Sequence, residues 1–154
     1  MGKLKKLPSP KIRKITGGKE PAKLVEEFLV SRGFNPEECL QQRSADAASW
    51  SVPIAPEEEL EISIEGLGRT NETTIYMGIN IMTIPTKNFH NALVAALTVA
   101  DTLIGAKLSL VNYDLVLSIT SYANDIGAHD LDYLFELISK QKTHIYDALI
   151  DEIK

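Results

Sequence analysis

The chain contains 154 residues, of which 44% are hydrophobic and 24% are charged, and its formal net charge is −5. This length suits one domain, which can bury about two-thirds of its unfolded surface. The single cysteine excludes an intrachain disulfide and favours a reduced, cytoplasmic setting. No apolar run approaches the roughly 20 residues that a membrane-spanning helix needs.

Charge divides the chain into two parts. Residues 1–19 carry seven basic side chains and no acidic one, so residues 20–154 sum to −12 because the whole chain is −5. An acidic body does not favour nucleic-acid binding, whereas the basic segment could contact phosphates or anionic lipid, or stay solvated. We therefore expect residues 1–18 to be a flexible basic tail and residues 19–154 to form a single α+β domain.

The first predicted elements are a helix and a short helical turn. Pro21 suits the first turn of a helix, and Gly33 can end it. Between them, four apolar residues recur at helical spacing: Leu24, Val25, Phe28 and Leu29. The next residues predict a short helical piece that ends near Gln42, followed by a polar connection over residues 44–48.

Three strands follow, each with apolar residues at alternate positions. The first has Trp50, Val52 and Ile54 at these positions. Because Pro53 lacks an N–H group, we place this strand at an edge of the sheet. The inward residues of the next two strands are Leu60, Ile62 and Ile64, then Ile75, Met77, Ile79 and Ile81.

The second half of the chain alternates helix, hairpin and helix. A long apolar run predicts a helix over residues 87–104, and residues 107–111 and 115–120 form a strand pair around a tight turn. A terminal helix begins near Ala128. The predicted fold is therefore α+β and two-layered, with a five-stranded antiparallel sheet, helices on one face, and the order α-β-β-β-α-β-β-α.

Several segments of this second half share a pattern of apolar and small residues: Ile84-Pro85, the helix 87–104, Gly105-Ala106-Lys107-Leu108-Ser109-Leu110, Val116-Leu117-Ser118, and Asp130-Leu131 with Leu134. With this pattern the chain resembles the YbjN-type family of bacterial proteins, whose fold is similar to that of type III secretion chaperones. The resemblance covers about residues 20–154. Some members of the family are described as regulators of sensory transduction, and the related chaperones are small acidic dimers that bind an extended segment of a partner protein. The resemblance therefore implies a protein-binding role, chaperone-like or regulatory.

The residues that could carry chemistry do not form a recognisable catalytic or metal site. None of His90, His129 and His144 has a second histidine three or four residues away, which is the spacing that a helical zinc site uses. Cys39 follows two glutamates, which oppose activation of its thiol. Glu61 and Glu65 would lie about 13 Å apart along a strand, too far to act as an acid–base pair. We expect no catalytic residue, no cofactor and no metal ion.

Two surfaces remain as candidates for binding. Tyr76 and Asn80 on the outward face of the third strand, with Trp50 and Val52 near an edge, are a candidate partner-binding surface. The alternative is an ordinary sheet face, exposed or buried in a dimer. Three further residues widen the apolar surface of the helix 87–104 beyond its core stripe and predict a homodimer contact there: Val94, Val99 and Leu103.

The sequence thus predicts a cytoplasmic, non-enzymatic protein-binding module, chaperone-like or regulatory and of the YbjN type. Its expected partners are an unidentified protein and a second copy of itself. Two alternatives stay open: a small enzyme or ligand-binding protein with an unrecognised site, and an adaptor recruited to an anionic surface by its basic tail.

Overall fold

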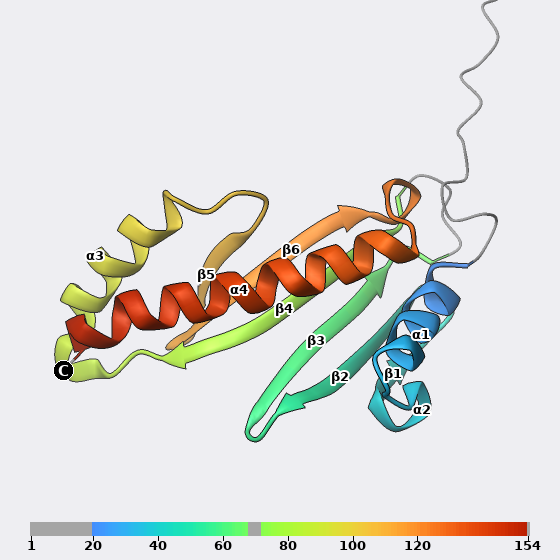
Figure 1. Ribbon diagram of the computed structural model, residues 1–154, viewed down its shortest axis with the longest axis horizontal. Helices are drawn as coiled ribbons and strands as arrows, with labels where there is room; N and C mark the ends of the chain where they lie inside the picture. Colours follow the sequence, from blue (N-terminus) through green and yellow to red (C-terminus); the bar gives the residue numbers. More distant parts are fainter. Residues whose placement is uncertain (1–19, 68–71, 154) are drawn as a thin grey trace, which may run out of the picture.

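The computed structural model describes residues 20–67 and 72–153 (Figure 1). In chain order, the elements are α1 (Pro21–Ser31), α2 (Pro36–Cys39), β1 (Leu40–Arg43), β2 (Ala47–Ala55), β3 (Glu58–Glu65), β4 (Thr74–Thr83), the 3₁₀ turn η1 (Thr86–Asn88), α3 (Phe89–Ala100), β5 (Lys107–Val111), β6 (Asp114–Tyr122), the 3₁₀ turn η2 (Ala123–Asp125) and α4 (Ala128–Ile153). The predicted basic tail, residues 1–18, lies outside the described residues.

The strands form one antiparallel sheet in the order β1-β2-β3-β4-β6-β5. Helix α4 lies lengthwise over β4 and β6 (Figure 1). Helix α1 packs beside the N-terminal half of α4, and α3 packs beside its C-terminal half. This arrangement is the predicted two-layer α+β fold, with helices on one face of an antiparallel sheet.

The sheet has six strands rather than the predicted five, because residues 40–43 form the strand β1. The sequence Leu-Gln-Gln-Arg contains one apolar residue, so it shows no alternation that would predict a strand. Pairing with β2 supplies the order instead: Leu40 lies opposite Trp50 and Arg43 opposite Ala48, with a register shift between them. The prediction of a helical piece up to Gln42 is therefore wrong beyond Cys39, because α2 ends there and β1 begins at Leu40.

Two further boundaries differ from the predictions. Strand β2 is not an edge strand, because β1 pairs with its first half. Pro53 lies beyond the end of β1, so its missing N–H group costs no hydrogen bond between β1 and β2. Helix α3 ends at Ala100 rather than at residue 104. The chain then turns through Gly105, whose φ of 74° suits a residue without a Cβ atom.

The buried face of the sheet is built from cross-strand rows. In one row, Trp50 pairs with Ile62, Ile62 with Met77, and Met77 with Ile119. None of these four side chains is more than 5% exposed. The alternate residues point to the opposite face and are mostly polar, as expected for an antiparallel sheet with one covered side.

Replacing Leu117 with aspartate tests this assignment of the buried face. Leu117 is fully buried in β6, between Ile79 of β4 and Leu108 of β5. A carboxylate there costs several kcal/mol, comparable with the total stability of a domain. We expect Leu117→Asp to abolish the cooperative urea transition measured by circular dichroism.

The matched control is Thr120→Asp on the same strand, because Thr120 is exposed on the opposite face. It should lower the free energy of unfolding by about 1 kcal/mol at most. A native-like transition in Leu117→Asp would show that the covered face is assigned incorrectly.

Candidate functional site

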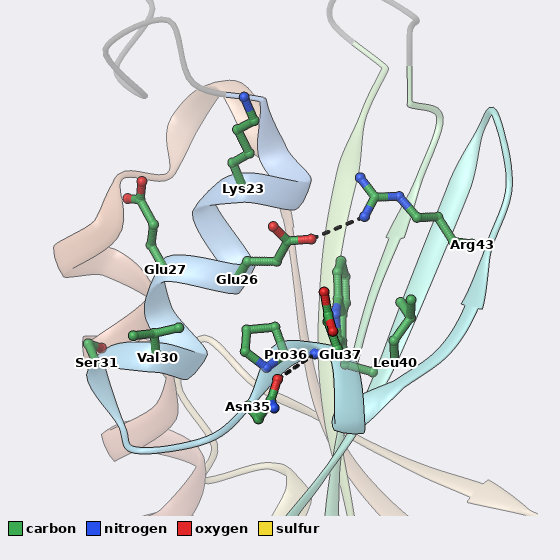
Figure 2. A pocket seen from close by; sticks show the side chains of 11 residues that line it. Lys23, Glu26, Glu27, Val30, Ser31, Asn35, Pro36, Glu37, Leu40 and Arg43 are labelled. Carbon is green, nitrogen blue, oxygen red and sulfur yellow. Dashed lines mark hydrogen bonds and ion pairs between the residues drawn. The ribbon is translucent and has the colours of Figure 1, made fainter.

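A groove of about 960 Å³ lies between α1, α2 and β1 (Figure 2). Its floor is apolar and is formed by Val30 of α1, Pro36 of α2, Leu40 of β1 and Trp50 of β2. The Trp50 side chain belongs to the core and is 1% exposed, whereas Val30 is 62% exposed. Because Val30 lies next to other apolar groups in a concave surface, burying it against a ligand would be favourable.

Charged side chains surround this floor. Arg43 donates from Nη1 to Glu26 Oε1 at 3.1 Å, which links β1 to α1 across the top of the groove (Figure 2). Lys23 and Glu27 lie along the α1 side, and Glu37 lies on the α2 side. The Arg43–Glu26 pair is largely exposed, so it contributes little to stability and can open for a ligand at small cost.

The base of the groove is fixed by the short helix α2. Asn35 is its N-cap: its Oδ1 atom accepts a hydrogen bond of 3.1 Å from the backbone N–H of Glu37. Pro36 occupies the first helical position, where its fixed φ suits a helix start. The cap and the proline together fix the start of α2, and the apolar ring of Pro36 faces α1 (Figure 2).

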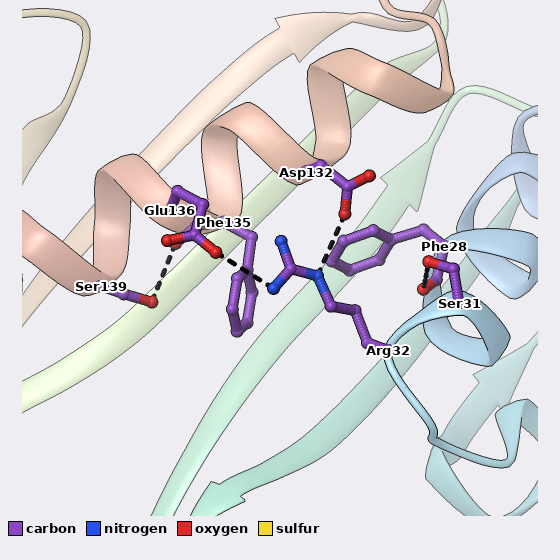
Figure 3. A network of polar contacts seen from close by, with 7 residues as sticks. All are labelled: Phe28, Ser31, Arg32, Asp132, Phe135, Glu136 and Ser139. Carbon is purple, nitrogen blue, oxygen red and sulfur yellow. Dashed lines mark hydrogen bonds and ion pairs between the residues drawn. The ribbon is translucent and has the colours of Figure 1, made fainter.

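The wall formed by α1 is attached to α4 by Arg32 (Figure 3). The Arg32 Nε atom donates to Asp132 Oδ1 at 3.0 Å, and Nη1 donates to Glu136 Oε1 at 3.1 Å. The guanidinium carbon lies 4.4 Å from the centroid of the Phe135 ring and 5.8 Å from that of Phe28. The two rings pack against each other with centroids 5.9 Å apart. The Arg32 guanidinium thus makes two charge-assisted hydrogen bonds and stacks on an aromatic ring at the same time.

A second hollow, of about 700 Å³, lies on the polar face of the sheet and includes Tyr76 and Asn80. The Tyr76 ring lies over Gly78, so that a side chain at position 78 would collide with it. Partial burial raises the pKa of the Tyr76 hydroxyl; the nearby Glu61 carboxylate raises it further, and a hydrogen bond with Ser118 opposes both effects. The Tyr76 hydroxyl is therefore protonated at neutral pH, and the side chain is positioned by Gly78 on the same strand and by Ser118 on β6.

The structure brings the four predicted surface residues together only in part: Trp50 borders the same hollow as Tyr76 and Asn80, whereas Val52 does not. Tyr76 and Asn80 lie on the polar face of β4, as predicted. Trp50 and Val52 are each 1% exposed and lie on the opposite, buried face, so they do not form an exposed surface with Tyr76. The reason is visible in β2, where these two apolar residues alternate with Ser49, Ser51 and Pro53 and so take the core side.

The three predicted dimer-contact residues are exposed to different degrees. Val94 is 51% exposed, whereas Val99 and Leu103 are half-buried against the core. Two residues that helical spacing predicts for the core stripe, Leu97 and Ile104, are instead exposed, at 71% and 82%. The apolar surface at this end of the molecule is therefore real, but it is shifted towards Leu97 and Ile104.

The described residues hold no group of three or more His, Cys, Asp and Glu side chains that could bind a metal ion. Cys39 is buried at the end of α2, and burial together with the Glu38 carboxylate raises the pKa of its thiol. A raised pKa keeps the thiol protonated at neutral pH and therefore weakly nucleophilic. Within residues 20–67 and 72–153, no helix is long and apolar enough to cross a membrane.

Sequence reasoning missed the groove and the Arg32 contacts. A signal for the groove was present: Val30 is an apolar residue outside the helical stripe of Leu24, Val25, Phe28 and Leu29. No such signal exists for Arg32, because Asp132 is 100 residues away in the chain.

No family model matches the chain, and no curated protein matches it in sequence. Solved structures do match. A chain of the HopA1–SchA chaperone–effector complex is 13% identical, with a TM-score of 0.54, and the match covers 81% of this chain and 91% of that one. The chain has a type III secretion chaperone fold.

Two further matches support this fold. The Yersinia pestis type III secretion chaperone SycH, solved with a fragment of YscM2, gives 14% identity and a TM-score of 0.52, over 81% of this chain and 98% of that one. The ExoU–SpcU complex from the type III secretion system of Pseudomonas aeruginosa gives 16% identity and a TM-score of 0.53, over 81% and 97% of the two chains. At such identities the likeness concerns the fold.

Arg32→Ala tests whether these contacts fix α1 to the body. The substitution removes two charge-assisted bonds and the stacking on Phe135, and it leaves Asp132 and Glu136 facing each other. We expect a loss of about 1–3 kcal/mol in the free energy of unfolding. Arg32→Lys should recover little of it, because an ammonium group cannot make both bonds and stack.

Arg43→Ala is the control for this experiment, since it removes one exposed ion pair. Its effect should stay within about 1 kcal/mol. Equal losses for Arg32→Ala and Arg43→Ala, measured by chemical denaturation, would contradict the assigned role of Arg32.

Proposed function

We propose that the protein binds an extended segment of a partner protein in the groove between α1, α2 and β1, as a non-enzymatic chaperone-like or regulatory module. The observation that carries this proposal is the exposed Val30 in the apolar floor of a groove that is bordered by charges. Similar folds occur in the HopA1–SchA chaperone–effector complex and in the chaperone SycH bound to a fragment of YscM2.

The neighbouring edge strand suits an extended ligand. β1 ends the sheet order, so the side of β1 away from β2 has no other described strand beside it. An extended segment could therefore add backbone hydrogen bonds to β1 while its apolar side chains contact Val30, Pro36 and Leu40. Such a ligand would need apolar residues at intervals, and polar or charged residues between them could face the charged rim.

We further propose a cytoplasmic setting and the YbjN type, both from the sequence alone. A cytoplasmic setting is inferred from the single cysteine. Assignment to the YbjN type is supported by the apolar and small-residue pattern of the second half of the chain.

We also propose that the protein is a homodimer that associates through α3 and β5. β5 is the other terminal strand of the sheet. The exposed apolar residues at this end are Val94, Leu97, Ile104, Leu110, Val111 and Tyr113. A second copy can remove such a patch from water and, at the edge of β5, replace hydrogen bonds to water by backbone hydrogen bonds.

Sedimentation equilibrium at micromolar concentration measures the dimer directly. The wild type should have about twice the monomer mass of 17.0 kDa, and Leu97→Asp should sediment as a folded monomer, because Leu97 is 71% exposed and contributes little to the core. A monomeric wild type would refute the dimer, and a dimeric Leu97→Asp variant would refute this interface.

Val30→Asp tests the groove. A binding peptide is first selected on the wild-type protein from a library of unstructured 20-residue sequences, and its affinity is then measured by fluorescence anisotropy. We expect Val30→Asp to weaken binding at least about tenfold, because it removes an apolar contact and adds a charge that the complex would desolvate. The fold should persist, since Val30 is 62% exposed.

The matched control is Tyr133→Asp. Tyr133 is 65% exposed on α4 and lines none of the described cavities, so its replacement should leave the affinity unchanged. Equal affinities for the wild type and Val30→Asp would mean that the peptide binds elsewhere, and the proposed site would be wrong.

A further inference from the structure

We propose that the basic segment Lys11-Ile12-Arg13-Lys14-Ile15-Thr16 of the same chain occupies the α1–α2–β1 groove when no partner is bound, and so competes with the partner. This inference rests on the proposed function, because it concerns the same groove. Residues 1–19 lie outside the described part of the chain, so their sequence and their point of attachment carry the inference.

The first support is charge. Residues 1–19 carry +7, whereas the rest of the chain sums to −12. The groove itself is lined by Glu26, Glu27 and Glu37 and by two basic side chains, Lys23 and Arg43, so its lining carries one net negative charge within an acidic body. The Arg43–Glu26 pair is exposed and can open, which leaves its carboxylate for a basic ligand. A segment with three basic residues therefore meets a complementary potential at the groove.

The second support is the spacing of apolar residues. In a polyproline II conformation, which has three residues per turn, Ile12 and Ile15 lie on one side, and Lys11 and Lys14 lie on another. The isoleucines can then contact Val30 and Leu40, while the lysines face the glutamates of α1. A single segment thus offers both kinds of contact that the groove provides.

The third support is the point of attachment. The groove begins at Lys23, three residues after Glu20, the first described residue. Gly17-Gly18 permits the reversal that would lay the preceding residues alongside α1. Six residues of polyproline II span about 19 Å, and the 11 residues of α1 span about 16 Å. The segment and the wall of the groove therefore match in length.

Because the segment is attached to the same chain, even a weak contact is enough for it to occupy the groove. A short linker gives a tethered segment an effective concentration in the millimolar range, so even millimolar intrinsic affinity fills the groove about half of the time. Occupation would keep Val30 away from water and from unspecific partners. A partner with a tighter segment would displace the tail.

The test compares three full-length, ¹⁵N-labelled proteins by NMR: the wild type, a double variant with Ile12→Asp and Ile15→Asp, and a control with Leu4→Asp and Leu7→Asp. Trp50 is the only tryptophan, so the single indole signal reports on the floor of the groove. We expect the first double variant to shift this signal and the amides of α1, α2 and β1, and the control to leave them unchanged. High salt should move the wild type towards the Ile12→Asp, Ile15→Asp spectrum.

Three results would overturn the proposal. Shifts confined to residues 1–19 would mean that the tail is free of the body. Shifts around Glu59, Glu61 and Tyr76 would place it on the polar face of the sheet. Shifts that disappear on dilution would place it on a second copy.

The selected peptide separates this inference from the proposed function. If the tail fills the groove about half of the time, the peptide should bind the Ile12→Asp, Ile15→Asp variant about twofold more tightly than the wild type. Equal affinities would refute competition by the tail and leave the groove as the partner site. Loss of sensitivity to Val30→Asp would instead refute the proposed function.

Discussion

Helix α1 is held by apolar packing, since five of its side chains are at most 4% exposed, and by one polar attachment at its C-terminal end. Arg32 follows the end of α1 and joins two carboxylates of α4 while it stacks on Phe135 (Figure 3). These contacts are partly shielded from water, because the Arg32 side chain is 27% exposed. They hold α1 against α4, on the side of the helix away from β1. The space left between α1 and β1 is the groove, so the shape of the candidate site follows from this attachment.

The two ends of the sheet present different opportunities for binding. At one end, β1 has an open edge beside the groove, whose floor is apolar and whose rim is charged. At the other end, β5 has an open edge beside the apolar residues of α3 and of the turn that follows it. Open strand edges invite pairing, and proteins protect them or use them. We infer that the first edge serves an outside segment and the second serves another copy of the chain.

Much of the fold could be predicted from the sequence, because alternation and helical spacing are local properties. The α+β class, the order of the long elements and the start of α4 near Ala128 follow from such patterns. Strand β1 could not be predicted, since a Leu-Gln-Gln-Arg segment has no period and becomes a strand only by pairing with β2. The Arg32 contacts could not be predicted either, because they join residues 100 and 104 positions apart.

The candidate site was harder to predict than the fold. Trp50 and Val52 were interpreted as surface residues from the nearby Pro53, although their alternation with serines already indicated the core side of β2. A concave site depends on the gap between two elements, and a single sequence contains no measure of that gap. The most useful local signal was Val30, an apolar residue on the otherwise polar side of α1.

Site-specific photo-crosslinking in the cells that produce the protein would test the central claim most directly. A photoreactive amino acid replaces Val30 in the groove, Tyr76 on the polar sheet face, or Tyr133 on α4, and mass spectrometry locates the crosslinked residues. Our account predicts that position 30 crosslinks to one contiguous segment of another protein, or to residues 11–16 of this chain when that protein is absent. Crosslinks to a partner from position 76, with none from position 30, would contradict it.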